Sequence, residues 1–515
     1  MKRRRTILLT LFLITVGILQ TLLMPAYFYA GDNFAMRAEA SDWLKTGKLG
    51  IDYSQRPILR GFLLERGQYF YENDDRQRLF SRYGFGETLF YLPSYALYKT
   101  FVGEAGLLED DPRLLLTMNI FAIFLTIASA ALLYLIASAF TKRLWLRFLF
   151  AAASIYSTLN IYYLRNLLPE TFQTPLTLLF IYSSIRLILC RRDKPAFAWT
   201  LVASFAAGIL LNLKGSFLLF YIPLGVAILC RFLGEDRRFS WRNMRRRALG
   251  FGLSLAIPAM MAAALLLWSN NIRFGSPFNT GYGQWIQNGV PHDHFSPSYL
   301  AKALPAFLWQ KGNANVFLHY PLLVLGLPGL ILVYKRQRPV FFFLLMLCVP
   351  YLLLIASYSG WRGEWCFGPR HLIYVLLALS IGFVPLLDWL AGRRPWIALA
   401  SLVLAAVICI FSAWQIYGVL ALRPFAYYRA KGSFAQLENA EIDEYFNDYW
   451  TRSGICRDML RHAAAKRQFP PMKHIKFLPT RAGLQRKQMI SRFVKEMASP
   501  NFYLFNENHL GRNSP

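Results

Sequence analysis

A carboxylate stands where the first long apolar run of the chain ends, at Asp32 within the stretch Tyr-Ala-Gly-Asp-Asn at 29–33. The next residues, 34–44, carry apolar side chains at helical spacing, which predicts an amphipathic helix with Asp32 at its N-terminus. An aspartate there accepts hydrogen bonds from the first N–H groups of the helix. The same carboxylate could also remove a proton from a hydroxyl as a general base. The two interpretations are compatible.

A second carboxylate, Glu170, follows Arg165 closely and ends the stretch Asn-Leu-Leu-Pro-Glu at 166–170, just before another apolar run. An acid in the first turn of a helix complements the helix dipole, which is a purely structural interpretation. A carboxylate at membrane depth is costly, however, and usually has a partner or a role. Glu170 is therefore a second candidate for chemistry.

The densest group of polar, aromatic and glycine residues lies at 359–371, between two apolar runs, with the sequence SGWRGEWCFGPRH. Glycines permit close approach or positive φ angles, and arginine is well suited to bidentate contact with phosphate. We expect Arg370 to contact a lipid-linked phosphate, and Trp361, Glu364 and Trp365 to contact substrate. The alternative is that the tryptophans and arginines only anchor the chain at the membrane interface.

Lys214 is a charge between two apolar runs, so it either extends its amine to the interface or makes a second contact to phosphate. The pair His292 and His294 could bind a metal, but a His-x-His pair in a loop is weak evidence. No divalent metal is therefore predicted firmly, although one is not excluded. Motifs of the P-loop, GxGxxG, HExxH and CxxC kinds are absent from the sequence, so nucleotide-driven transport is not supported.

These residues lie in a chain of 515 residues that is 55% hydrophobic, 16% aromatic and 17% charged. Soluble domains are about 45–50% apolar and about 25% charged, and a membrane-spanning helix needs roughly 20 mostly apolar residues. We expect about eleven such helices by this length criterion. Their expected ranges are 6–28, 113–139, 146–163, 172–190, 196–213, 215–233, 248–269, 316–334, 340–358, 371–390 and 396–420.

The net charge is +29, and much of it forms short basic clusters between the apolar runs. Lysine and arginine mark cytoplasmic loops in this way, so nucleic-acid binding is not expected. Every second loop is basic if the chain starts in the cytoplasm with an uncleaved first helix. This pattern predicts a multi-pass inner-membrane protein with a cytoplasmic N-terminus and a periplasmic C-terminus. The expected cytoplasmic segments are 141–147, 190–194, 231–247, 334–338 and 392–393.

The first outer loop, 31–111, contains an apolar, aromatic segment at 84–102 that we expect to lie in the membrane interface, with Pro93 interrupting its helix. If this segment spanned the membrane, the sides of all later loops would invert and the charge pattern would break. Residues 421–515 form a polar, basic C-terminal region of unknown fold, outside the transmembrane domain of 1–420. Cys366 and Cys456 would both face an oxidising compartment, but nothing in the sequence shows that they meet.

The pattern of these residues resembles the GT-C superfamily of membrane glycosyltransferases, among them the protein O-mannosyltransferases and lipid A aminoarabinose transferases. Gly31-Asp32 resembles the first-loop acid of the family, and Leu168-Pro169-Glu170 its second-loop acid. The segment from Tyr83 through Gly86 to Pro93 resembles the entry to its second juxtamembrane helix. The stretch from Trp361 to Arg370 resembles a W-x-G-G-x-x-x-G-P-R motif, with Glu364 at the second glycine. Asn33 after Asp32, and Glu87 near a usual proline, depart from the pattern and argue against protein O-mannosylation.

The resemblance implies an all-α polytopic GT-C-like fold with a juxtamembrane first outer loop. It implies inverting transfer of a sugar from a polyprenyl-phosphate-linked donor to an envelope acceptor, which could be lipid A or lipopolysaccharide, polysaccharide or protein. Asp32 would be the general base, and Glu170 would orient the acceptor or help to bind a metal. Arg370, Lys214 and Arg165 would contact the donor phosphate, and Tyr83 the substrate.

Two other classes of function stay open. One is a flippase or transporter of lipid-linked saccharides, which would show paired inverted halves with broken helices; no convincing internal symmetry is visible. The other is a non-catalytic scaffold for envelope assembly, in which Asp32 and Glu170 are only helix caps.

Overall fold

The computed structural model describes residues 2–22, 32–53, 70–73, 76–103, 112–166, 168–233, 241–281, 295–309, 314–361 and 368–421. Nine helices in this described part of the chain are long and apolar enough to cross a membrane. They confirm the expected fold class, an all-α multi-pass membrane protein. The C-terminal region 421–515 lies almost entirely outside the described residues, as does Cys366.

The N-terminal part of the chain contains one long apolar helix followed by a compact, partly β-structured loop. The expected helix after the first apolar run is confirmed, and it begins at Asp32. Its expected amphipathic character is wrong, because residues 35–42 are buried on all faces and include the polar side chains of Arg37, Glu39 and Asp42. The small antiparallel sheet, with strand order β1-β3-β2, was not anticipated from the sequence. The elements are α1 (Lys2–Leu22), α2 (Asp32–Thr46), β1 (Ile51–Asp52), β2 (Phe70–Asn73), β3 (Arg78–Ser81) and α4 (Phe85–Phe101).

The middle of the chain is a series of long helices. They are α5 (Pro112–Ala137), α6 (Leu144–Tyr156), α7 (Asn160–Asn166), α8 (Pro169–Leu189), α9 (Asp193–Leu213), the 3-10 helix η2 (Gly215–Phe220), α10 (Tyr221–Leu233) and α11 (Trp241–Phe274). The remaining helices are α13 (Pro297–Trp309), α14 (Val316–His319), α15 (Leu323–Arg336), α16 (Arg338–Ala356), η3 (Arg370–Leu372), α17 (Ile373–Ser380), α18 (Phe383–Leu390) and α19 (Pro395–Ala421).

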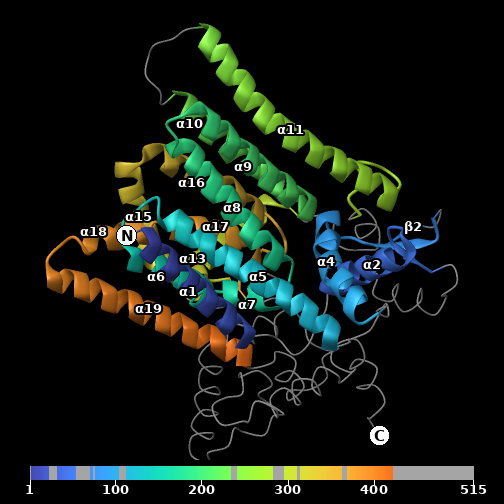
Figure 1. Ribbon diagram of the computed structural model, residues 1–515, viewed down its shortest axis with the longest axis horizontal. Coiled ribbons are helices and arrows are strands. Elements are labelled where there is room, and N and C mark those ends of the chain that lie inside the picture. The colour runs from blue at the N-terminus through green and yellow to red at the C-terminus, as the bar shows by residue number, and fades with distance from the viewer. Residues whose placement is uncertain are drawn as a thin grey trace, which may run out of the picture.

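The helix α8 lies at the centre of the bundle. It packs along α5, α9 and α10, while α11 packs against the far side of α9. The apolar stretch Pro169–Leu189 of α8 is 67% buried, whereas the apolar stretch Met244–Phe274 of α11 is only 17% buried. The exposed residues of α11 include Leu253, Ile257 and Met260, as expected for a helix whose outer face meets lipid. In Figure 1, α2, α4 and β2 lie together at one end of the bundle.

The expected number of about eleven spanning helices is not confirmed in the described residues, because two of the expected helices are each divided there into shorter ones. The segment 146–163 is interrupted after Tyr156, where the Thr158 hydroxyl donates to the Ser154 carbonyl and the Asn160 amide donates to the same carbonyl at 2.7 Å. The segment 316–334 is interrupted at Tyr320, next to Pro321, which has no N–H to continue a helix. Side-chain hydrogen bonds thus end the helix at the first point, and a proline ends it at the second.

The expected interruption at Pro93 is wrong, because α4 is continuous from Phe85 to Phe101. A proline inside a helix removes a hydrogen bond and costs about 3 kcal/mol. Tyr91, Tyr95 and Tyr98 are buried on one face of α4. Their packing stabilises the helix on both sides of the proline. With 17 residues, α4 is shorter than the helices that qualify as candidate spans, and its expected place in the membrane interface stays a prediction.

Several of the basic loops that were expected to share one side of the membrane contact one another through two aspartates. Asp388 accepts a hydrogen bond from Thr141 at 2.6 Å and pairs with Arg143 at 3.4 Å and Arg336 at 3.8 Å. Asp193 pairs with Arg231 and Arg247, each at 3.3 Å. These contacts join basic segments that are distant in sequence into two groups, and the side of the membrane on which the groups lie stays a prediction.

Candidate functional site

Lys214 and Arg370, two of the three residues expected to contact phosphate, both lie close to His371. Lys214 caps the C-terminus of α9, and its Nζ lies 3.0 Å from Nδ1 of His371. Arg370 and His371 begin η3, and their side chains are 8% and 7% exposed. Both cations interact electrostatically with the imidazole. Two segments more than 150 residues apart, α9 and η3, thus place a positive cluster at one point.

The backbone just before Arg370 is held in a conformation that suits glycine. Gly368 has a φ of +74°, and a Cβ atom there would lie 2.8 Å from Cδ2 of His319. His319 is itself fixed, because its Nδ1 lies 2.8 Å from the carbonyl oxygen of Asn315. The N–H of Arg370 donates to the Gly368 carbonyl at 2.8 Å. The glycine-rich motif therefore sets where η3 begins and where Arg370 is placed.

Glu170 lies in the first turn of α8, which starts with Pro169 in a position that prolines favour. Its side chain is 4% exposed. The carboxylate interacts electrostatically with the phenols of Tyr351 on α16 and Tyr374 on α17. The position fits the helix-dipole interpretation of Glu170 and also brings the carboxylate into the neighbourhood of the positive cluster, because Tyr374 interacts with Arg370 as well.

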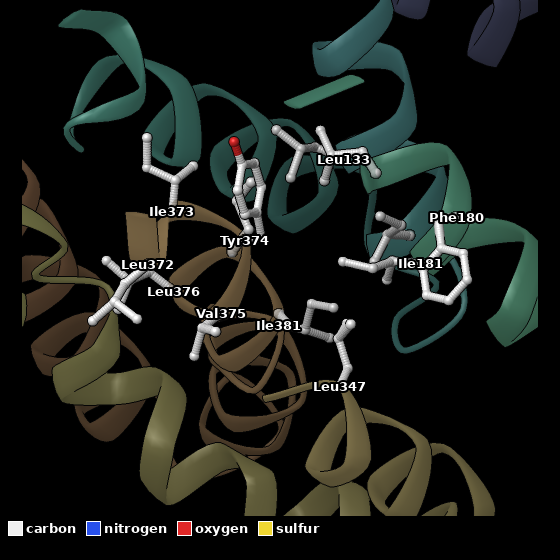
Figure 2. Close-up of a cluster of buried hydrophobic side chains, with 14 of the residues drawn as sticks. Leu133, Phe180, Ile181, Leu347, Leu372, Ile373, Tyr374, Val375, Leu376 and Ile381 are labelled. Atoms are coloured by element: carbon white, nitrogen blue, oxygen red, sulfur yellow. The ribbon is translucent and has the colours of Figure 1, made fainter. Parts of the chain in front are cut away.

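A chain of buried hydrogen bonds joins three helices beside this point. The Tyr374 hydroxyl donates to Oε1 of Gln173 on α8, and Nε2 of Gln173 donates to Oε1 of Glu87 on α4 at 2.8 Å. Glu87 is 2% exposed. Figure 2 shows Tyr374 within the apolar cluster that α17 shares with Phe180 and Ile181 of α8. The hydrogen-bonded chain therefore carries polar groups through an otherwise apolar core.

The start of α4 contacts the end of α9 backbone to backbone. A Cβ atom at Gly84 would lie 2.1 Å from the carbonyl oxygen of Leu213, and one at Gly86 would lie 3.0 Å from the carbonyl carbon of Asn212. Only glycine permits so close an approach. The Tyr83-Gly84-Phe85-Gly86 segment thereby holds the start of α4, where Glu87 lies, against the C-terminal end of α9.

A buried ion pair that the sequence interpretation missed connects α2 to α11. Arg273 lies 3.4 Å from Oε2 of Glu39 on α2, and also donates to the carbonyl oxygens of Ser81 and, at 2.9 Å, of Tyr83. Glu39 accepts a further bond from the Thr88 hydroxyl at 3.1 Å. Burial raises the pKa of Glu39, and the neighbouring Arg273 opposes that rise. The pair fixes α2, the helix that Asp32 begins, against α11.

The remaining site residues expected from the sequence are only partly described. Asp32 is the first residue of α2, but its side chain and that of Arg165 lie outside the described side chains, and Glu364 and Trp365 lie outside the described residues. Trp361 is 4% exposed and packs edge-on against Phe307 at 5.6 Å between ring centroids. Tyr83 is partly buried. The substrate contacts expected of Trp361 and Tyr83 remain predictions.

No group of three or more histidine, cysteine, aspartate or glutamate side chains that could hold a metal ion occurs in the part of the chain that the structure describes. His292 and His294 lie outside that part. The carboxylates nearest the positive cluster, Glu87 and Glu170, are joined to Gln173 and the two phenols rather than grouped for a cation.

Four residues near the positive cluster were not selected from the sequence: His371, Tyr374, Gln173 and Glu87, the last noted only as a departure from a family pattern. A spacing signal was present for two pairs. Gln173 follows Glu170 by one helical turn on α8, and Tyr374 follows Arg370 by four residues. For Glu87, the signal was a carboxylate inside an apolar, aromatic segment.

Neither a protein-family model nor a curated protein matches the amino-acid sequence. Among solved structures, the chain is similar to the archaeal oligosaccharyltransferase AglB from Archaeoglobus fulgidus in complex with an inhibitory peptide and a dolichol-phosphate, at 11% identity and a TM-score of 0.49. It is also similar to ArnT from Cupriavidus metallidurans bound to undecaprenyl phosphate, at 12% identity and a TM-score of 0.49.

The similarity extends over most of this chain but over less of the solved proteins. It covers 95% of this chain and 63% of AglB, and 96% of this chain and 74% of ArnT. The chain therefore spans less than two thirds of the length of AglB.

Proposed function

We propose that the chain is a membrane glycosyltransferase that moves a sugar from a polyprenyl-phosphate-linked donor to an envelope acceptor at the periplasmic face. The observation that carries the proposal is the meeting of Lys214, His371 and Arg370 near two buried carboxylates, Glu170 and Glu87. Cations are needed where a phosphate leaves, and a carboxylate is needed where a hydroxyl loses its proton. The acceptor would be lipid A or lipopolysaccharide, a polysaccharide or a protein.

In the proposed reaction a hydroxyl oxygen of the acceptor attacks the anomeric carbon of the donor sugar. The bond between that carbon and the phosphate oxygen breaks, and its electron pair stays on the polyprenyl phosphate that leaves. Asp32 takes the proton of the attacking hydroxyl as general base. Attack from the face opposite the phosphate inverts the configuration at the anomeric carbon.

The cations act on the leaving group. Negative charge grows on the phosphate oxygen as the bond breaks, and Arg370 with Lys214 would stabilise that charge. Burial of Arg370 at 8% exposure strengthens the interaction, because water screens it little. Arg165 is proposed as a further phosphate contact, and Glu170 as the group that orients the acceptor.

The first outer loop supplies the general base in this proposal, so α2 must be held still. The ion pair between Glu39 and Arg273 restrains α2 against α11, and the glycine contact restrains α4 against the end of α9, which carries Lys214. A general base must lie within hydrogen-bond reach of the proton that it removes. These contacts are therefore as much a part of the proposed machinery as the charges.

The test is release of undecaprenyl phosphate from a panel of undecaprenyl-phosphate-linked sugars, incubated with purified protein and an extract of envelope acceptors and measured by mass spectrometry. The proposal expects release with at least one sugar by wild type, and at least a 100-fold loss in Arg370→Gln, a size typical of a missing charge-stabilising group. Arg191→Gln, a change at an exposed arginine away from the cluster, is the matched control. Movement of the lipid-linked sugar across a vesicle membrane, without release of undecaprenyl phosphate, would instead favour a flippase.

A further inference from the structure

The imidazole of His371 is oriented by Lys214. Nδ1 of His371 lies 3.0 Å from Nζ of Lys214. A lysine ammonium carries only donors, so Nδ1 must be the acceptor and cannot hold the proton. The neutral ring therefore carries its proton on Nε2. Tyr358 packs edge-on against the same ring at 5.8 Å between centroids and helps to keep the ring in this orientation.

The proton on Nε2 is a buried donor. The side chain is 7% exposed, and Nε2 has no hydrogen-bond partner among the residues that the structure describes. A buried N–H that bonds to nothing is costly, and such groups in native proteins commonly belong to a site that binds something else. The ring that carries this donor follows Arg370 in sequence and accepts a hydrogen bond at Nδ1 from Lys214, so the donor lies near two cations and would suit an anionic oxygen.

We propose that Nε2–H of His371 is a third phosphate donor, which binds a non-bridging oxygen of the polyprenyl phosphate between the contacts of Arg370 and Lys214. This inference rests on the proposed function, since it assigns a further residue to the same phosphate. A neutral donor suits the position because a third cation beside Lys214 and Arg370 would be repelled by both. In this arrangement Lys214 has two effects, because it contributes charge and also fixes the tautomer of the histidine.

Two substitutions separate the two nitrogens of the ring. His371→Asn retains an acceptor at the position of Nδ1 and can keep the bond from Lys214, but it has no donor at the position of Nε2. His371→Gln places an amide N–H near the position of Nε2. The expected order of affinity for undecaprenyl phosphate is therefore wild type, then His371→Gln, then His371→Asn.

Binding is measured with full-length protein in detergent micelles, with undecaprenyl phosphate and undecaprenol as paired probes. Wild type should bind the phosphate form more tightly than the alcohol, and His371→Asn should reduce that preference roughly 10- to 100-fold, the size expected for a lost hydrogen bond to a charged group. Thermal denaturation checks that both proteins are folded. If wild type and His371→Asn then show the same preference for undecaprenyl phosphate over undecaprenol, the assignment of His371 is overturned but the proposed function stands. No preference in wild type would overturn both.

A second measurement needs only the wild-type protein for its main result. With ¹⁵N-histidine labelling, and His371→Gln used to assign the resonance, the ring nitrogens of His371 should show the Nε2-protonated tautomer. Undecaprenyl phosphate should shift the Nε2 resonance, whereas undecaprenol should not. A proton on Nδ1, or the same shift with both lipids, would contradict the proposal.

Discussion

Oε2 of Glu39 lies 3.4 Å from the guanidinium of Arg273, and the two side chains are 0% and 1% exposed. The pair joins α2 to α11 across more than 230 residues of sequence. Arg273 has the larger role, because it also donates to the carbonyl oxygens of Ser81 and Tyr83. The two partners are therefore expected to respond differently to substitution.

Replacing Arg273 with methionine should destabilise the protein by about 3–5 kcal/mol, the usual cost of removing one partner of a buried pair. The change leaves the Glu39 carboxylate and two backbone carbonyls without their shared donor. Thermal unfolding in detergent, followed by tryptophan fluorescence, measures the loss. Arg191→Met, at an exposed position, is the control and should change stability by less than about 0.5 kcal/mol. Similar melting temperatures for the two variants would contradict the role given to Arg273.

Stability should depend on pH through Glu39, because burial raises its pKa above the ordinary value of 4.5. The folded protein then holds this proton more tightly than the unfolded chain. The resulting stability is fully present below the ordinary value and is lost as pH rises through the raised pKa. Glu39→Gln cannot titrate, so its melting temperature relative to wild type should rise as pH is increased from about 4 to about 8. A difference that does not change with pH would show that Glu39 keeps an unshifted pKa.

The close contact at the start of α4 predicts a strong effect of one added methyl group. Gly84→Ala would bring Cβ to 2.1 Å from the Leu213 carbonyl oxygen, so the helix must shift away from α9. Such overpacking costs typically about 1–3 kcal/mol. Gly215→Ala is the matched control at the same junction, because a Cβ there meets nothing within 4 Å. Unfolding temperatures and sugar-transfer rates should both fall in Gly84→Ala, and neither should fall in Gly215→Ala; equal behaviour would refute the contact.

The buried chain from Tyr374 through Gln173 to Glu87 should depend on its central amide. Gln173→Leu has a similar size but leaves the Tyr374 hydroxyl without its acceptor and removes a donor from Glu87. Each buried polar group that loses its bond costs about 1–3 kcal/mol. Melting temperatures of Gln173→Leu, Tyr374→Phe and the double variant measure the coupling. The double variant should be less destabilised than the sum of the single changes, and strict additivity would contradict the hydrogen bond.

Much of the fold could be predicted from the sequence, because apolar length and basic loops respond to the bilayer locally. The helix that begins at Asp32 and the long apolar helices of the bundle are examples. The division of the expected span at 146–163 could not be predicted in this way. It depends on hydrogen bonds of Thr158 and Asn160 to one carbonyl, which an apolar pattern does not encode.

The cations of the candidate site could be predicted from the sequence, but the contacts between its residues could not. Lys214 and Arg370 were selected from the sequence because each is a cation among apolar residues. His371 contacts Lys214 and follows Arg370, but a neutral histidine beside an apolar run does not stand out in the sequence. The pair of Glu39 and Arg273 depends on tertiary packing between segments far apart in sequence, so no local pattern could reveal it.

The central claim is that Asp32 is the general base of a sugar transfer, and complementation measures it most directly. In a strain lacking the gene, wild type, Asp32→Asn and the control Asp52→Asn are expressed at matched membrane levels, and envelope glycans are compared by mass spectrometry. Asp52 is another acid of the first outer loop, and it pairs with Arg78 at 3.5 Å. We predict that wild type and Asp52→Asn restore a glycan whose mass difference identifies the sugar, whereas Asp32→Asn does not. Full restoration by Asp32→Asn would contradict the account and leave Asp32 as a helix cap.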